Sequence, residues 1–215
     1  SANDEAAWLK IQLNGGALPD GKALFSKAQH AEMWKPVTVM PLPQLPESLK
    51  LAQPTYQSYA LGWQVQDYRG HKLISHGGGV LGSITRVVLI PEKNVGFTIM
   101  MNSEDSGLLL GLTYRMIDHY LGMPDNGWID KWESWYQSRL EGGRQALAAM
   151  QAGKQAGDTK AAALPADRYA GRYRDAWYGD VVVDSDARGL TVDFTSSPNM
   201  AGRLTHWAYN SFITD

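Results

Sequence analysis

Cysteine is absent from this sequence of 215 residues. The chain therefore forms no disulfide bond, carries no thiolate nucleophile and holds no cysteine-ligated metal. Because such a composition suits an oxidising compartment, we expect the protein to be periplasmic or secreted. Hydrophobic residues make up 44% of the chain, which is enough to build the core of one large domain or two modest ones.

Long apolar runs and a surplus of one charge are also lacking. No apolar run approaches the roughly 20 residues that a membrane-spanning helix needs, and no signal peptide is visible. The net charge of -2 gives no electrostatic reason to expect nucleic acid or acidic lipid as a partner. The first residue is Ser1 rather than methionine, so we expect a processed or truncated N-terminus.

The sequence offers little support for a metal or nucleotide site. Its five histidines show neither H-x-H nor H-E-x-x-H spacing, which favours isolated structural histidines over metal ligands. Residues 77–82, GGGVLG, match the G-x-G-x-x-G fingerprint. A dinucleotide site needs a helix to begin there, whereas the strand-like sequence SITRVVLI follows. We therefore expect neither a metal nor a cofactor.

The most informative part of the sequence is HKLISHGGGVLGSITRVVLIPEKNVGFTIMMN, which predicts three strands. A short apolar run at 72–75 ends at His76. Residues 83–90 are rich in β-branched side chains, as strands prefer. Residues 95–101 form a continuous apolar run, which is typical of a strand buried on both faces.

Three glycines follow the histidine, and glycine lets other atoms approach the backbone closely. One interpretation of His76 with Gly77, Gly78 and Gly79 is a tight bend between strands beside a hydrogen-bonded histidine. The other is the edge strand of an active site. A glycine N–H would then point at a developing oxyanion. His76 would donate a hydrogen bond to it or place a positive charge nearby. The residues alone leave both interpretations open.

Helical periodicity, with capping and stop signals, predicts four helices in the rest of the chain. Their expected ranges are about 3–13 (capped by Asn3 or Asp4 and ended by Gly15-Gly16), 26–33, 106–120 and 128–152. Alternation predicts one more strand at 59–68. Half of the ten prolines lie within 36–58, which predicts an irregular surface loop there.

The composition changes after the fourth predicted helix. Residues 151–163 are small and polar and are predicted to form a linker. Residues 169–215 contain only strand-like segments separated by turn residues. The predicted fold class is α+β, with an antiparallel sheet flanked by helices and a small all-β module at the C-terminal end.

Several segments together resemble the C-terminal part of serine hydrolases of the penicillin-binding protein and class C β-lactamase-like family. The likeness lies in YALGW, HGGGVLGS and VVLIPEKNVGFTIMMN, with SANDEAAWLKIQLNGG before them, and covers about residues 1–122. In that family the third catalytic motif is Lys-Thr-Gly, with His-x-Gly as a replacement. The resemblance thus implies that His76-Gly77-Gly78 is this motif, that the Gly79 N–H serves the oxyanion hole and that Asn102 lies near a substrate carboxylate.

The family's other two motifs are absent from the chain. Neither the nucleophile motif Ser-x-x-Lys nor the second motif Tyr-x-Asn occurs, so we expect both to lie before Ser1. The resemblance implies acyl transfer on an ester, amide, lactam or D-amino-acid peptide, with the missing N-terminal segment of the same protein as partner. The alternative is a non-catalytic binding or regulatory protein on the same scaffold.

Residues 164–215 resemble the lipocalin-like module that many relatives carry after the catalytic domain, on the strength of YAGRY, YGD and HWAYNSF. We expect three parts: a partial catalytic domain at 1–122, a helical segment and linker at 123–163, and this module at 164–215. Four aromatic residues of the module could stack on a ligand or form its core, the core being favoured. They are Trp177, Tyr178, Trp207 and Tyr209.

Overall fold

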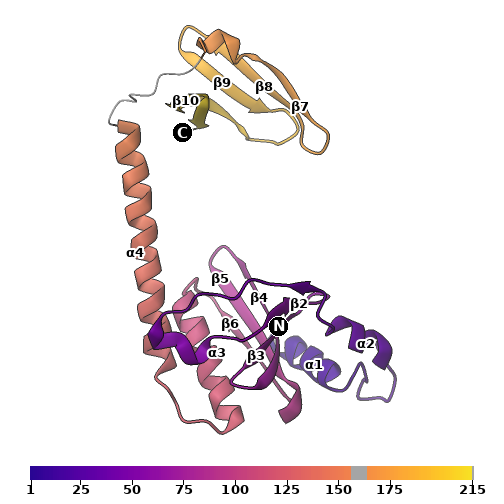
Figure 1. Ribbon diagram of the computed structural model, residues 1–215. Coiled ribbons are helices and arrows are strands. Elements are labelled where there is room, and N and C mark those ends of the chain that lie inside the picture. The colour runs from indigo at the N-terminus through magenta and orange to yellow at the C-terminus, as the bar shows by residue number, and fades with distance from the viewer. Residues whose placement is uncertain (156–163, 215) are drawn as a thin grey trace. The chain divides into compact units, whose positions relative to one another are not determined.

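The computed structural model describes residues 1–155 and 164–214 (Figure 1). Contacts divide the chain into two units, Ser1–Glu141 and Gly142–Asp215. The first unit holds a six-stranded antiparallel sheet with helices on both faces, and the second holds a five-stranded antiparallel sheet. The predicted α+β fold class is confirmed.

The sheet of the first unit has the strand order β1-β2-β3-β4-β5-β6, so every strand pairs with its neighbour along the chain. The strands are β1 (Thr38–Val39), β2 (Gln57–Tyr59), β3 (Gln64–Tyr68), β4 (His71–Val80), β5 (Ser83–Ile90) and β6 (Val95–Met101). The predicted bounds of the last two strands, 83–90 and 95–101, are those observed.

Four α-helices lie where the periodicity predicts them, together with short 3-10 turns in the connections. They are α1 (Ala2–Leu13), α2 (Lys27–Met33), α3 (Ser106–Leu121) and α4 (Trp128–Gln155), with η1 (Glu47–Ala52) and η2 (Pro91–Lys93). The predicted irregular loop between α2 and β2 thus contains a short strand and a 3-10 turn. Of the predicted linker, residues up to 155 belong to α4, and 156–163 lie outside the described residues.

The N-terminus of α1 differs from its prediction. The helix begins one residue after Ser1, and Asp4 accepts hydrogen bonds from the Ser1 hydroxyl at 2.8 Å and from its amino group at 2.9 Å. Asp4 therefore lies inside the first turn, where the helix dipole interacts favourably with a carboxylate. Asn3 is helical too. The predicted stop is confirmed, because Gly15 and Gly16 follow the helix at φ values of +63° and +96°.

The predicted strand at 59–68 is in fact a hairpin between β2 and β3. Ala60 donates its N–H to the carbonyl of Trp63 at 2.7 Å, and Gly62 takes a φ of +80° between them. Because only glycine adopts this conformation readily, Gly62 reverses the chain. The alternating pattern of the sequence passes through this turn and conceals it.

β4 is longer than the sequence predicts, and this changes the position of the glycines. The strand does not end at His76 but continues through Gly77, Gly78 and Gly79 to Val80, so of the two interpretations left open by the sequence the tight bend is wrong. None of these three glycines has a positive φ, and each pairs with a residue of β5. The chain reverses only afterwards, at Leu81 and Gly82.

β6 is the second strand whose environment differs from the prediction. Of its seven residues only Phe97 is buried, so the strand is not covered on both faces. Within the described sheet it is the edge strand, paired with β5 on one side. The apolar run therefore marks a strand with one unpaired edge, which is the kind of strand that attracts further pairing.

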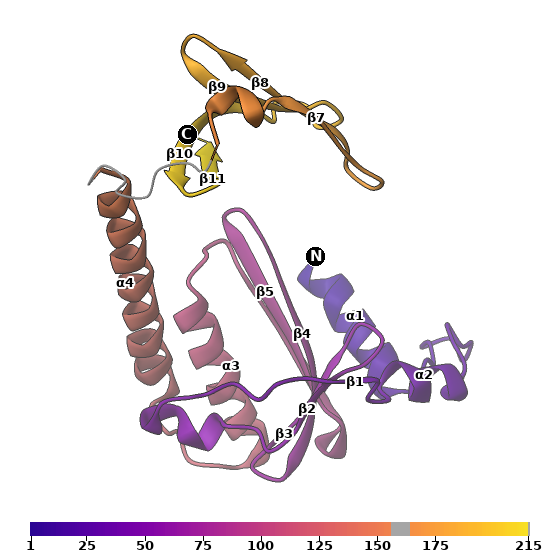
Figure 2. The same cartoon turned by 45° about the horizontal axis from the view of Figure 1, so that its top comes forward.

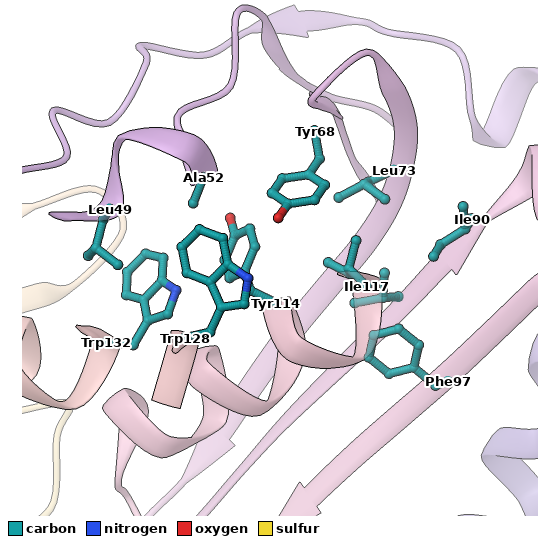
Figure 3. Close-up of a cluster of buried hydrophobic side chains, with 11 residues drawn as sticks. Leu49, Ala52, Tyr68, Leu73, Ile90, Phe97, Tyr114, Ile117, Trp128 and Trp132 are labelled. Atoms are coloured by element: carbon teal, nitrogen blue, oxygen red, sulfur yellow. The ribbon is translucent and has the colours of Figure 1, made fainter. Parts of the chain in front are cut away.

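The two faces of the sheet carry separate hydrophobic clusters. We call the face covered by α3 and the start of α4 the α3 face, and the opposite face, covered in part by α1, the α1 face (Figure 2). The buried cluster on the α3 face, shown in Figure 3, consists of Leu49, Ala52, Tyr68, Leu73, Val88, Ile90, Phe97, Tyr114, Ile117, Trp128 and Trp132. The smaller cluster on the α1 face consists of Leu9, Ala60, Trp63, Val65, Ile74 and Leu89.

A buried carboxylate joins three elements on the α3 face. Asp118 is 1% exposed and accepts hydrogen bonds from the hydroxyl of Tyr68 and from the indole N–H of Trp128, each at 2.6 Å. The guanidinium group of Arg69 lies 3.7 Å from the same carboxylate. Burial and the bond to Asp118 raise the pKa of Tyr68 far above its ordinary value, so its hydroxyl remains a donor.

The second unit confirms the prediction that the C-terminal part is all β. Its sheet has the order β11-β10-β9-β8-β7, preceded by the 3-10 turn η3 (Ala166–Arg168). The strands are β7 (Gly171–Asp175), β8 (Gly179–Asp186), β9 (Gly189–Phe194), β10 (Ala201–Ala208) and β11 (Ser211–Thr214). Trp177, Tyr178 and Tyr209 are exposed, so they are not the core of this unit. Trp207 is partly buried.

Among the described residues, no helix combines the length and apolarity required to cross a lipid bilayer. The same residues contain no group of three or more histidine, aspartate or glutamate side chains arranged to bind a metal ion.

Candidate active site

His76 lies on the α1 face of the sheet, in the half of β4 that leads to the turn with β5. It pairs with Val87 of β5, and it shares its face with Ile74 because side chains alternate along a strand. Ile74 is fully buried, whereas His76 is half-buried. The strand therefore leaves the hydrophobic cluster at this point and enters a more open environment.

A cavity of about 370 Å³ lies beside this histidine. Its walls come from α1 and from the three consecutive strands β4, β5 and β6. The lining residues are Glu5, His76, Gly77, Gly78, Thr85, Arg86, Val87, Thr98 and Met100. Its volume lies within the range of small-molecule sites, which begins at about 300 Å³.

The imidazole of His76 has one hydrogen-bond partner among the described residues. The hydroxyl of Tyr59, the last residue of β2, lies 3.0 Å from Nε2 of His76. The two rings meet edge to face, with centroids 6.0 Å apart. β3, which separates the two strands, begins only at Gln64, opposite Ser75, so it does not shield His76 from Tyr59.

The register of the hairpin indicates where the backbone groups of the glycines point. Val80 and Ser83 close the turn between β4 and β5, so we infer that they form a hydrogen-bonded pair. Because such pairs alternate along antiparallel strands, Gly78 bonds to β5, whereas Gly77 and Gly79 direct their N–H groups away from it. β3 has ended on that side, which leaves these amides facing an open edge.

Glycine is not required here by the backbone conformation. A Cβ atom at Gly77 would lie 3.4 Å from the carbonyl oxygen of Thr85, and one at Gly78 would lie 3.6 Å from the Thr85 hydroxyl; both are ordinary contacts. At Gly79 the Cβ would lie 3.2 Å from the Ile84 side chain, which is tighter. What the glycines provide is a strand without side chains beside the cavity, so that its backbone remains accessible.

A buried cation lies behind the glycines on the opposite face. Arg86 pairs with Gly77, and its guanidinium group donates a hydrogen bond to the Ser75 hydroxyl at 3.1 Å. Burial lowers the pKa of Arg86. No carboxylate forms an ion pair with it among the described residues. A Cβ at Gly77 would lie 3.6 Å from the guanidinium group, which is an ordinary contact, so the arginine does not require a glycine there.

Asn102 is the one predicted site residue outside the immediate neighbourhood of His76. It is exposed, follows the last residue of β6 and does not line the cavity. The adjoining Met101 pairs with Ile84 and accepts a hydrogen bond from the Ser83 hydroxyl at 2.8 Å. Asn102 therefore lies near the β4–β5 turn. The structure brings His76, Gly77 and Gly78 together at the cavity, with Gly79 next along the strand.

Several residues of the site were not identified as site residues from the sequence, although Glu5 and Tyr59 lie in segments that carry the family resemblance. The cavity also involves Glu5 of α1, Thr85 of β5, and Thr98 and Met100 of β6, while Tyr59 contacts the histidine from β2. The register of β4, β5 and β6 would have identified the strand residues, since cross-strand neighbours share a face. The contacts of Glu5 and Tyr59 depend on how α1 and β2 pack, which no spacing in the sequence reveals.

Two family models match parts of this chain. A family model described as Beta-lactamase matches residues 1–120, which is 120 of the 215 residues. A second model, described as a domain of unknown function (DUF3471), matches residues 155–215.

Two curated relatives are fungal hydrolases by name. Unguisins hydrolase ungD' of Aspergillus campestris (strain IBT 28561) is 28% identical over 190 residues, covering 84% of this chain and 32% of the relative. Unguisins hydrolase ungD of Aspergillus violaceofuscus (strain CBS 115571) is 29% identical over 134 residues, covering 58% of this chain and 23% of the relative. The chain thus spans about a third or less of the length of these relatives.

A solved structure also matches the chain. The octameric penicillin-binding protein homologue from Pyrococcus abyssi aligns with a TM-score of 0.46 and 17% sequence identity, covering 94% of this chain and 36% of that chain. The match of the Beta-lactamase model over more than half of the residues decides the family of this chain. The chain belongs to the beta-lactamase family.

Proposed function

We propose that the protein is a serine hydrolase that works by acyl transfer. The observation that carries the proposal is the accessible strand His76-Gly77-Gly78 beside a cavity of about 370 Å³ within a domain of the beta-lactamase family. Support also comes from two relatives of this chain that are named hydrolases. The expected substrate is an ester, amide, lactam or D-amino-acid peptide, and a periplasmic or secreted location belongs to the same proposal.

In this mechanism a serine in a Ser-x-x-Lys motif attacks the substrate carbonyl, and water later releases the acyl group. That motif and Tyr-x-Asn are proposed to lie in a part of the protein that precedes Ser1. The oxyanion would be held by the nucleophile's own N–H and by the N–H of Gly79. The open edge inferred for the Gly79 amide supports this role. His76 would donate a hydrogen bond to the reacting group or place a positive charge beside it.

The unpaired edge of β6 supports the proposal that a further segment of the same protein completes the sheet. β6 is apolar, and it is the edge strand of the described sheet. A strand added there would cover an edge that is otherwise open to association. Residues 164–215 are proposed to form a lipocalin-like module, a description supported by the antiparallel meander of β7 to β11.

The role of Gly79 can be tested by removing its N–H group. In the longer protein that carries the nucleophile, we expect Gly79→Pro to lower turnover of a chromogenic ester or cephalosporin by on the order of 10²–10³, the usual effect of losing one oxyanion donor. Gly79→Ala is the matched control, because it keeps the N–H and adds only the Cβ that approaches Ile84. Unchanged turnover in Gly79→Pro would remove Gly79 from the mechanism.

The enzyme and the non-catalytic alternative are distinguished by the coding sequence that precedes Ser1. The motifs Ser-x-x-Lys and Tyr-x-Asn, in that order, are expected there if the protein is a hydrolase. A longer protein that lacks both, and that binds substrate analogues without turnover, would instead be a binding or regulatory protein on this scaffold.

A further inference from the structure

The contact between Tyr59 and His76 joins two segments that carry the family resemblance, YALGW and HGGGVLGS, but Tyr59 lies outside the three catalytic motifs. Tyr59 Oη lies 3.0 Å from His76 Nε2, and the edge-to-face packing of the rings restrains the imidazole as well. Both side chains are half-buried. The tyrosine thus occupies one ring nitrogen of the histidine that lines the cavity and leaves the other, Nδ1, for a ligand.

We propose that Tyr59 is a positioning residue that holds His76 as a neutral imidazole with its proton on Nδ1. The hydroxyl of Tyr59 donates to Nε2, and the Nδ1–H group is then the donor that His76 offers to the cavity. The catalytic meaning of this arrangement rests on the proposed hydrolase function, whereas the protonation pattern itself does not.

The direction of the hydrogen bond decides the protonation of the ring. A neutral imidazole has one donor and one acceptor nitrogen, and a phenol is a good donor at neutral pH. If the Tyr59 hydroxyl donates, Nε2 must be the acceptor and Nδ1 must carry the proton. The opposite arrangement requires Nε2–H to donate to the phenolic oxygen, either in the other tautomer or in an imidazolium ion.

The proposed tautomer changes which group the motif presents to a substrate. In the resembled family the position of His76 carries a lysine, whose ammonium group brings a charge. Here the group presented would be a single neutral N–H close to the backbone. An asparagine amide places its nitrogen near the position of Nδ1, whereas glutamine places it near Nε2. Asparagine should therefore replace His76 better than either glutamine or lysine does.

The protonation pattern can be measured on residues 1–215 by ring nitrogen NMR near neutral pH, with His76→Asn used to assign the His76 signals. We expect Nδ1 to show the protonated signature and Nε2 the unprotonated one. Tyr59→Phe, which keeps the ring and removes the hydroxyl, should shift the population toward Nε2–H. Tyr120→Phe is the matched control, because its ring contacts His119 rather than His76. A wild-type ring protonated on Nε2, or one unaffected by Tyr59→Phe, would overturn the proposal.

Turnover by the longer protein supplies the second readout. We expect Tyr59→Phe to lower kcat about two- to tenfold, as the loss of one neutral hydrogen bond does, with KM nearly unchanged. His76→Asn should retain more activity than His76→Gln; the reverse order would contradict an Nδ1–H donor. If the wild-type longer protein shows no turnover at all, the proposed function fails, while the NMR result still decides the role of Tyr59.

Discussion

The two faces of the six-stranded sheet differ in how completely they are covered. On the α3 face, helices and an aromatic cluster bury the sheet and enclose the carboxylate of Asp118. On the α1 face the cluster is smaller, and the cavity beside His76 opens where it ends. Neighbouring residues of one strand, Leu73 and Ile74, point into these two environments. The difference indicates that one face is closed by the core, whereas the other leaves room for the proposed chemistry.

The largest effect is expected from removing the buried carboxylate of the α3 face. Asp118→Ala leaves the Tyr68 hydroxyl and the Trp128 indole N–H without acceptors. Each orphaned buried donor costs about 1–3 kcal/mol in the free energy of unfolding. Urea denaturation followed by tryptophan fluorescence measures the loss.

Asp118→Asn is the control for this prediction, because it keeps the volume and one acceptor oxygen. It should lose less stability than the alanine variant. Equal stability of wild type and Asp118→Ala would show that the donors find water instead, and that the α3 face is less sealed than its burial indicates.

Two glycines provide a second comparison between the faces. A Cβ at Gly111 of α3 would lie 2.6 Å from the backbone Cα of Ile129, whereas one at Gly96 of β6 would meet the end of the Leu89 side chain at 2.8 Å. Backbone cannot move aside, but a leucine methyl group can. Gly111→Ala should therefore cost about 1–3 kcal/mol, and Gly96→Ala less than about 1 kcal/mol.

Gly142→Ala is the reference for these variants, since nothing lies within 4 Å of the added atom. In the helix α4 it should stabilise by up to about 1 kcal/mol. Thermal unfolding of the three variants measures the order. A larger loss for Gly96→Ala than for Gly111→Ala would mean that the α1 face is the more rigid of the two.

The smallest effect is expected in the pH dependence of stability, through His30 of α2. Burial lowers the pKa of His30 below its ordinary value of 6.5, and its Nε2 is buried without a partner among the described residues. The unfolded chain thus binds this proton more tightly, so stability is full above about pH 6.5 and declines as the pH falls from there toward the lowered pKa.

His30→Phe keeps a ring against Phe25 and Trp34, which pack on His30. It should therefore reduce the difference between urea midpoints at pH 7.5 and pH 5.5. Identical pH dependence in the variant and the wild type would assign the effect to other groups.

Much of the fold could be predicted from the sequence because its signals are local. Ser26 and Asp105 cap their helices by accepting N–H bonds from Gln29 and Leu108, and Gly122 ends α3 at a φ of +72°. Such signals depend on a few neighbouring residues. The alternation at 59–68 failed, by contrast, because a two-strand hairpin can preserve the same pattern across its turn.

The candidate site was only partly predictable. His76, Gly77 and Gly78 line the cavity, and the family resemblance identified them, but the strand was expected to end at the histidine. Whether a glycine run bends or pairs depends on its partner, and here β5 supplies a β-branched strand in register. The contact with Tyr59 comes from tertiary packing, which single-sequence periodicity does not encode.

The buried carboxylate of Asp118 also constrains the order in which the elements of the first unit pack during folding. Its two donors lie 50 and 10 positions away in sequence, so the carboxylate links a distant strand, its own helix and the start of the next one. Desolvating that charge before both donors arrive would be unfavourable. We therefore expect β3, α3 and the first turn of α4 to dock together late in folding, as one cooperative step.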